Sequence, residues 1–151
     1  MNVEDERKIF WQKFEDILNE NGNPFDITYI MGGSIRHWAV VNRNNAWNAK
    51  ALEAMFLKNK RIIQVDIYIQ DDLFCFNRLY PHVKELQDSV KVPIECVAGE
   101  RNGNTRRIKC EFPFAYGYKC DYDRVIEEIL PVMIKFKEFL DKYTSYEFFD
   151  Y

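Results

Sequence analysis

The segment Ile62–Ile69 restricts the fold of this chain more than any other, because its residues alternate as they do in a β-strand with one buried face. One face carries Ile63, Val65, Ile67 and Ile69, and the other carries Gln64, Asp66, Tyr68 and Gln70. Residues 51–57 precede this strand across the short link Lys58–Arg61. The residue types in 51–57 favour a helix, but two extended runs joined by a short link form a hairpin. We therefore predict that residues 51–57 form the first arm of that hairpin.

Helical periodicity occurs in three other parts of the chain. Apolar residues at helical spacing predict an opening helix that stops at Asn21–Gly22, and a closing helix over residues 121–143 with a bend at Pro131. A helix after Asp71 and Asp72, either of which can cap it, has a stripe made of Leu73, Phe76, Tyr80, Val83 and Leu86. Pro81 lies within this stripe and predicts a kink or a break near Tyr80.

The remaining strands are predicted at residues 37–41, 94–97 and 107–112. Asn102–Gly103, a strong hairpin signal, lies between the last two. In the final arm Ile108, Cys110 and Phe112 alternate with Arg107, Lys109 and Glu111, which predicts one buried face and one wet, charged face. The element order is α-β-β-β-α-β-β-α. It predicts an α+β fold with a mainly antiparallel sheet of about five strands, in two hairpins, and three helices.

A length of 151 residues fits one domain, which we place at residues 1–145, followed by an aromatic C-terminal tail at 146–151. The tail, Tyr146, Phe148, Phe149 and Tyr151, is predicted to dock either on the domain or on a partner or second subunit. No apolar run is long enough to span a membrane, and the acidic N-terminus does not have the pattern of a signal peptide. We therefore expect a cytoplasmic protein.

The cysteine and histidine pattern gives no indication of a metal or cofactor site. The four cysteines lie at positions 75, 96, 110 and 120 without a C-x-x-C pair, and His37 and His82 are far apart. We expect reduced thiols that pack as small apolar groups, with no metal and no cofactor.

Charge is distributed unevenly along the chain. Residues 36–61 contain six basic residues and one acid, Glu53, and residues 101–109 contain four basic residues and no acid, whereas both ends of the chain are acidic. Basic groups in turns can neutralise phosphates, and a tryptophan can stack on a base. A nucleic-acid-binding surface would therefore use the basic hairpins 58–61 and 101–109: Arg43, Lys58, Lys60, Arg61, Arg101, Arg106, Arg107 and Lys109, with Trp47 as the stacking side chain.

A metal-dependent nuclease is a further alternative, although the chain does not have the expected motif. A PD-(D/E)XK-type site needs a strand carboxylate and a D/E-x-K pair on the next strand, and the only such tripeptide is Glu6-Arg7-Lys8, in the opening helix. This alternative would require Glu53, Asp66 and Glu95 to converge on a divalent ion.

Several segments of the chain are similar to those of a known family. They are the opening helix with Phe10-Trp11-Gln12-Lys13-Phe14, the later Trp38, the hairpin that ends in Ile62–Ile69, the helix from Leu73-Phe74 and the closing helix. Over residues 7–145 the chain resembles a bacterial family of domains of unknown function. Members of this family often lie C-terminal to PD-(D/E)XK-type nuclease modules in restriction-like proteins. The resemblance implies an accessory role in such a system, and we expect this chain to be a standalone version.

These observations predict a non-catalytic recognition or accessory domain of a defence- or nucleic-acid-linked system. It would act through a protein partner or through self-association, because acidic ends and a basic middle are complementary. Nucleic-acid binding and, less favoured, metal-dependent nuclease activity remain the alternatives. Catalysis is not expected.

Overall fold

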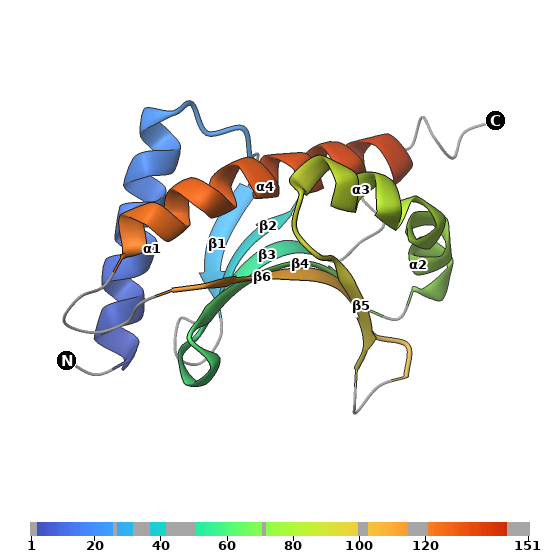
Figure 1. Ribbon diagram of the computed structural model, residues 1–151, viewed down its shortest axis with the longest axis horizontal. Coiled ribbons are helices and arrows are strands. Elements are labelled where there is room, and N and C mark those ends of the chain that lie inside the picture. Colours follow the sequence, from blue (N-terminus) through green and yellow to red (C-terminus); the bar gives the residue numbers. More distant parts are fainter. Residues whose placement is uncertain are drawn as a thin grey trace.

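The computed structural model describes residues 3–25, 27–31, 37–41, 51–70, 72–99, 103–114 and 121–144, and it has the α+β class predicted from the sequence. The described residues form a six-stranded antiparallel sheet in the order β1-β2-β3-β4-β6-β5 (Figure 1). The strands are β1 (Ile27–Met31), β2 (His37–Val41), β3 (Ala51–Leu57), β4 (Ile62–Ile69), β5 (Glu95–Ala98) and β6 (Arg106–Pro113). The helices are α1 (Val3–Glu20), α2 (Leu73–Leu79), α3 (Val83–Val90) and α4 (Tyr122–Thr144), with short 3-10 turns at η1 (Lys58–Lys60) and η2 (Tyr80–His82).

The hairpin predicted at the centre of the chain is confirmed. Strands β3 and β4 pair antiparallel, with Leu57 opposite Ile62 and Ala51 opposite Tyr68, and η1 lies in the link between them. Helix-forming residue types in 51–57 thus adopt the strand that the hairpin pattern requires, because burial and cross-strand pairing outweigh local propensity.

Two details of the predicted order are wrong. Residues 27–31 form β1, a strand not expected from the sequence, which brings the count from five to six. Strand β1 has five residues, too few to show a clear periodicity in the sequence, and it is identified by its pairing with β2. The kink or break predicted near Tyr80 is confirmed at η2, where Pro81 has no N–H to continue the ladder, and it divides the single helix of the predicted order into α2 and α3.

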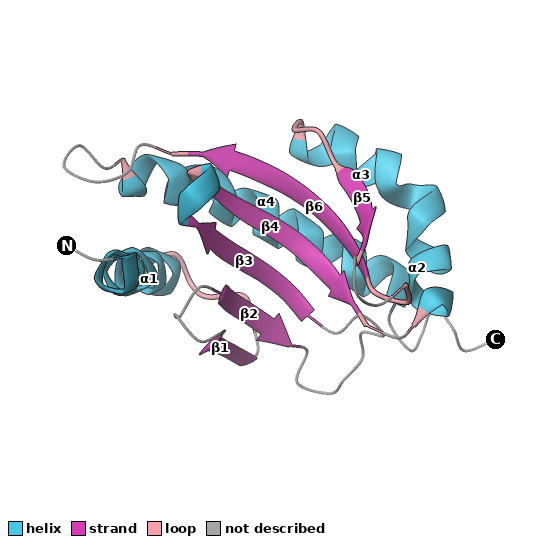
Figure 2. Cartoon of the chain, turned by 90° about the horizontal axis from the view of Figure 1, so that it is seen from below, coloured by secondary structure: helices cyan, strands magenta, loops and turns pink. Residues whose placement is uncertain are grey.

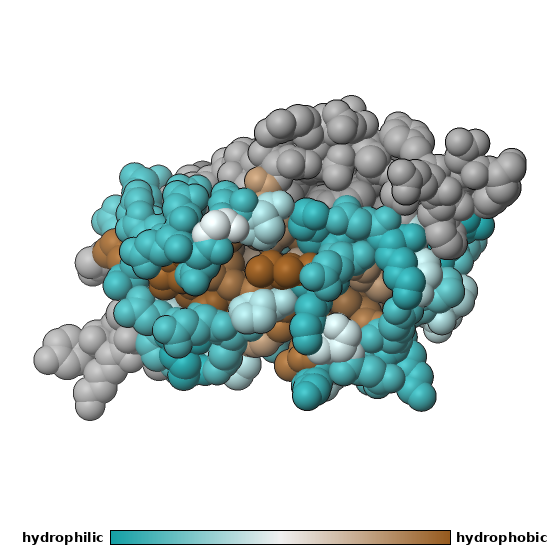
Figure 3. All heavy atoms as spheres, turned by 90° about the horizontal axis from the view of Figure 1, so that it is seen from above, coloured by the Kyte–Doolittle hydropathy of each residue, from teal (hydrophilic) through white to brown (hydrophobic). Residues whose placement is uncertain are grey.

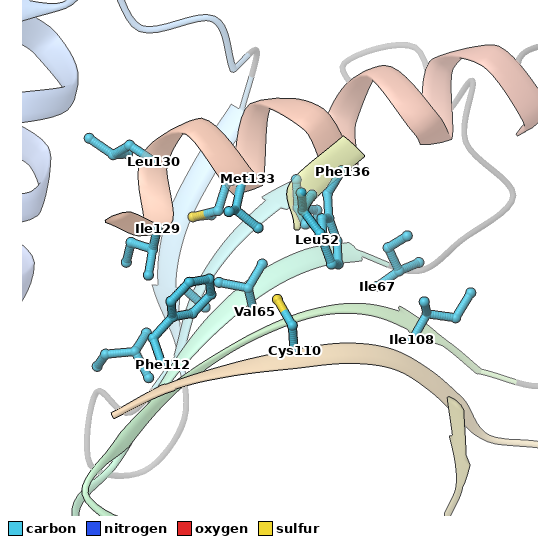
Figure 4. Close-up of a cluster of buried hydrophobic side chains, with 14 of the residues drawn as sticks. Leu52, Val65, Ile67, Ile108, Cys110, Phe112, Ile129, Leu130, Met133 and Phe136 are labelled. Carbon is cyan, nitrogen blue, oxygen red and sulfur yellow. The ribbon is translucent and has the colours of Figure 1, made fainter. Parts of the chain in front are cut away.

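Helix α4 covers one face of the sheet, with α2 and α3 beside it at one end and α1 at the other (Figure 1). Its inward stripe packs on the alternating apolar residues of the central strands (Figure 4). The contacting side chains include Ile129, Met133 and Phe136 of α4, Val65 and Ile67 of β4, and Ile108, Cys110 and Phe112 of β6. None of the helices in the described part of the chain is long and apolar enough to cross a membrane.

Helix α1 is attached to the core by a cluster of aromatic rings. The Phe10 ring centroid lies 4.8 Å from that of Trp11 and 5.3 Å from those of both Phe56 and Tyr122. The buried Arg7 guanidinium donates hydrogen bonds of 2.8 and 3.2 Å to the carbonyl oxygen of Phe56. Helix α1 therefore joins β3 and α4 through both ring packing and a charge-assisted hydrogen bond.

The three described cysteines, Cys75, Cys96 and Cys110, are free. Burial raises the pKa of the Cys75 and Cys110 thiols to about 12, with smaller contributions from nearby carboxylates. Both thiols are therefore protonated at neutral pH and pack as apolar groups. The fourth cysteine, Cys120, lies outside the described residues.

Replacing Phe10 by alanine is expected to lower the free energy of unfolding by about 3–5 kcal/mol, because the lost ring leaves a cavity among its aromatic neighbours. Urea unfolding followed by circular dichroism measures this loss. The adjacent Ile9, 40% exposed, provides the matched control, and Ile9→Ala is expected to change stability by no more than about 0.5 kcal/mol. Equal losses for both variants would contradict the burial of this face of α1.

Candidate functional site

The face of the sheet opposite α4 carries a row of charged residues across four strands. Figure 2 shows this face from below, with β3, β4 and β6 in front of α4. The strand register places Glu53 opposite Asp66, Asp66 opposite Lys109, and Lys109 opposite Glu95. Residues that are directly opposite one another in a sheet point to the same face, so these four side chains share it.

Glu53, Asp66 and Arg107 form a buried ionic cluster at the centre of this row. The Nη1 atom of Arg107 donates to both carboxylate oxygens of Asp66, at 3.1 Å each, and also to Glu53. Gln64 donates a further hydrogen bond of 2.8 Å to Asp66, and the Arg107 guanidinium stacks 4.4 Å from the centroid of the Tyr68 ring. Asp66 is completely buried and Glu53 is 3% exposed. The wet face predicted for the final arm is thus only partly present: Glu111 is exposed, whereas Arg107 and Lys109 are half-buried.

Burial raises the pKa of Asp66 well above its ordinary value, and the neighbouring Glu53 carboxylate raises it further, whereas Arg107 and Gln64 act in the opposite direction. Two carboxylates and one guanidinium carry a net charge of −1 when both acids are ionised. A proton on Asp66 brings the cluster to neutrality, which is the state that a buried site favours.

The arrangement of this row does not resemble a catalytic metal site. The Arg107 guanidinium contacts the carboxylates of both Glu53 and Asp66. The Nζ atom of Lys109 lies 3.9 Å from Oε2 of Glu95 and 3.0 Å from Oε1 of Glu111. Protein cations thus occupy the positions between the acids. Within the described ranges, no group of three or more His, Cys, Asp or Glu side chains is placed to hold a metal ion.

The structure separates the residues predicted to bind nucleic acid. Arg107 and Lys109 are engaged with carboxylates, whereas Lys60 and Arg61 are exposed beside η1. The η1 turn and Arg106 lie at opposite ends of β4, about 23 Å apart for seven residue steps. The two basic turns therefore do not form one continuous surface. Arg43, Trp47, Arg101, the side chain of Lys58 and the aromatic tail Tyr146, Phe148, Phe149 and Tyr151 lie outside the described residues.

Two adjoining hollows, which share Ile17 and Glu127 in their linings, form a groove between α1 and α4 on the helical side of the molecule. Figure 3 shows this side from above, with apolar surface gathered between polar side chains. The apolar end of the groove has a volume of about 310 Å³ and is lined by Ile17, Leu18, Asn21, Pro24, Glu127, Leu130, Pro131 and Ile134. The adjoining acidic end is lined by Lys13, Asp16, Ile17, Asp123 and Glu127. We call the two ends together the helical groove.

The acidic end of the helical groove has an excess of negative charge. Three carboxylates line it, those of Asp16, Asp123 and Glu127, against the single ammonium group of Lys13, which lies 3.4 Å from Asp123. Helical periodicity predicted both helices, but it did not predict that a groove forms between them. That depends on how α1 and α4 pack together.

A scan against protein-family models, a search of curated proteins and a search of solved structures each found no match. The resemblance to the family of domains of unknown function therefore stays a prediction. The fold defines the chain as a small α+β domain, and its functional sites have to be inferred from its own residues.

The raised pKa of Asp66 predicts a specific pH dependence of stability. The folded state holds the Asp66 proton more tightly than the unfolded chain does, so this group stabilises the fold at low pH. That stabilisation is lost as the pH rises from about 3.9, the ordinary value, through the raised pKa of the folded state. In urea titrations, the free energy of unfolding of the wild type is expected to fall relative to that of Asp66→Asn as the pH rises from about 4 through the raised pKa. The same substitution at the exposed Asp123 is the control, and parallel curves for wild type and Asp66→Asn would contradict the shift.

Removal of Arg107 is expected to be strongly destabilising, because it leaves Glu53 and Asp66 buried without their cation. Arg107→Ala is predicted to lower the free energy of unfolding by about 3–5 kcal/mol at neutral pH. Lys60→Ala, at an exposed position of the β3–β4 hairpin, is expected to change it by no more than about 0.5 kcal/mol. Similar losses of unfolding free energy in Arg107→Ala and Lys60→Ala would show that Arg107 does not stabilise the fold through its two carboxylates.

Proposed function

We propose that this chain is a non-catalytic recognition domain that holds a basic amphipathic helix of a partner protein in its helical groove. As the resemblance implies, the domain would be an accessory part of a defence- or nucleic-acid-linked system. The observation that carries the proposal is the pairing of an apolar end with an acidic end in one groove.

The size of the groove favours side chains over a cofactor. Ligand pockets span roughly 300–1,000 Å³, and the apolar end, at about 310 Å³, is at the lower limit of that range. A space of this size accepts the few apolar side chains that one face of an amphipathic helix presents. Helix-in-groove recognition uses such anchors at successive helical turns.

The chemistry of the groove favours a basic helix. Lysine or arginine side chains flanking the apolar anchors would meet Asp16, Asp123 and Glu127 at the acidic end. Pro131 has no N–H to donate to the carbonyl oxygen of Glu127, four residues earlier in α4, and both residues line the groove.

The charged row on the opposite face supports a role without catalysis. Its carboxylates are bound to Arg107, Lys109 and Gln64, and Asp66 is closed off from solvent. Carboxylates that are paired in this way link the strands to one another and are poorly placed to contact a substrate.

A pair of designed peptides tests the proposal. Each peptide has about 18 residues, enough for a marginal helix in water, with leucine on one face and either lysine or glutamate on the other. The lysine peptide is expected to bind the full chain, as measured by fluorescence anisotropy, and the glutamate peptide is not. Ile134→Asp is expected to weaken binding of the lysine peptide on the order of tenfold, because a charge replaces an apolar contact in the groove.

Charge reversal within the groove provides the control for electrostatic complementarity. Glu127→Lys is expected to weaken the lysine peptide on the order of fivefold and to improve binding of the glutamate peptide. Asp88→Lys makes the same charge change on α3, outside the groove, and is expected to leave both affinities close to those of the wild type. Equal binding of both peptides would contradict the proposal. Concentration-dependent dimers abolished by Ile134→Asp would make a second copy of the chain the occupant of the groove.

A further inference from the structure

Strand β5 is an edge strand, and among the described residues no further strand pairs with its outer side (Figure 2). Its pairing with β6 shows which backbone groups face outward. The N–H of Gly99 donates a 2.9 Å hydrogen bond to the carbonyl oxygen of Thr105, and the β5–β6 register continues in phase with this bond. Successive residues of a strand present their backbone groups to opposite sides. The N–H and C=O groups of Cys96 and Ala98 therefore point away from β6, along the open edge.

One other group on this edge already has a partner. The N–H of Ile94, two residues before Cys96, donates a 3.0 Å hydrogen bond to Oε1 of Gln87 on α3. In the described part of the chain, no such partner faces Cys96, which is half-buried, or Ala98, which is exposed. Unpaired N–H and C=O groups on a sheet edge form a template for one further strand. The open edge of β5 therefore presents two residues for pairing.

This edge is complementary to a second copy of itself. Its two outward-facing residues, Cys96 and Ala98, lie on either side of Val97. A two-fold axis at Val97 places Cys96 of each copy opposite Ala98 of the other, and each of these pairs exchanges two backbone hydrogen bonds. The same register places Glu95 opposite the uncharged Gly99, so like charges are not paired across the axis.

The two ends of β5 also have complementary shapes. Beyond its end the chain turns back towards β6, and Gly103 and Asn104 are exposed on this turn. Beyond its start lies a hollow of about 410 Å³, lined by Gln87, Asp88, Lys91, Val92 and Pro93. An antiparallel pair about Val97 brings the turn of each copy alongside the hollow of the other, because both lie a few residues beyond the paired Glu95 and Gly99.

We propose that two copies of this chain associate through β5, in an antiparallel pairing about a two-fold axis at Val97 that joins their six-stranded sheets into one continuous sheet. The paired edge is short, so the dimer is weak and reversible. Neither β5 nor the hollow beside it contributes to the helical groove between α1 and α4, so the dimer presents two such grooves. A partner with two basic helices gains avidity from this arrangement.

Analytical ultracentrifugation of the full chain from about 5 to about 500 µM tests the proposal, and the wild type is expected to shift from monomer towards dimer. Ala98→Pro removes an N–H on the open edge and leaves the β5–β6 hydrogen bonds in place. It is expected to weaken association on the order of tenfold or more, because the two-fold axis doubles the loss. Ala98→Thr keeps the N–H and is expected to associate like the wild type. Circular dichroism checks that each variant is folded.

Disulfide cross-linking tests the register. The pairing places the two Val97 Cα atoms about 4.5 Å apart, within the range of a disulfide, so Val97→Cys is expected to form a covalent dimer on oxidation. Glu95→Cys, on the same strand and face, is the matched control, because its two copies are about 13 Å apart and out of reach. The wild type measures the background from the native cysteines.

Three results would overturn the proposal. They are a wild type that stays monomeric across the concentration series, equal association of Ala98→Pro and Ala98→Thr, and equal cross-linking of Glu95→Cys and Val97→Cys. A monomeric wild type that binds an extended valine–threonine peptide, in a manner abolished by Ala98→Pro, would make a strand of another protein the occupant of this edge. Binding of the lysine peptide to the helical groove is measured separately, so neither result decides the other.

Discussion

Strand β4 is almost completely buried on both faces, and this constraint organises the rest of the molecule. One face is apolar and lies under α4, so it is stabilised by removing hydrocarbon from water. The other face carries Gln64 and Asp66, which are buried without a helix over them in the described part of the chain, and their polar groups need partners from the neighbouring strands. Glu53 from β3 and Arg107 from β6 are those neighbours. The ionic cluster therefore sits across the three central strands, where a one-residue slip in register would separate its members.

The sequence was sufficient for features that depend on local pattern. The alternation in Ile62–Ile69, the break near Pro81 and a helix cap at one of the two candidates, Asp71 and Asp72, are all present in the structure, where Asp72 is the cap. Features that depend on distant pairing were missed or misjudged. Strand β1 pairs with β2, and the buried Asp66 accepts hydrogen bonds from Arg107, 41 residues later in the chain. Neither fact is encoded in the few residues around the position concerned.

The candidate sites show the same division. Exposed Lys60 and Arg61 were correctly placed in a turn, but the predicted charged surface is divided because Arg107 and Lys109 pair with acids of adjacent strands. The groove proposed here for binding arises where two elements meet, α1 and α4, which are far apart in the sequence. Its lining depends on how these helices pack together, so the pattern of neither helix alone predicts it.

The insertion of α2, α3 and β5 between β4 and β6 has a consequence for the order of folding. Pairing β4 with β6 closes a loop of 36 residues, 70–105, which costs about 2 kcal/mol more in entropy than closing the four-residue link of the β3–β4 hairpin. The hairpin is therefore the natural early structure, and the centre of the sheet is completed only when β6 docks. Arg107 reaches its two carboxylates in that same late step. The ionic cluster of Glu53, Asp66 and Arg107 is therefore expected to form after the hairpin that supplies its two carboxylates.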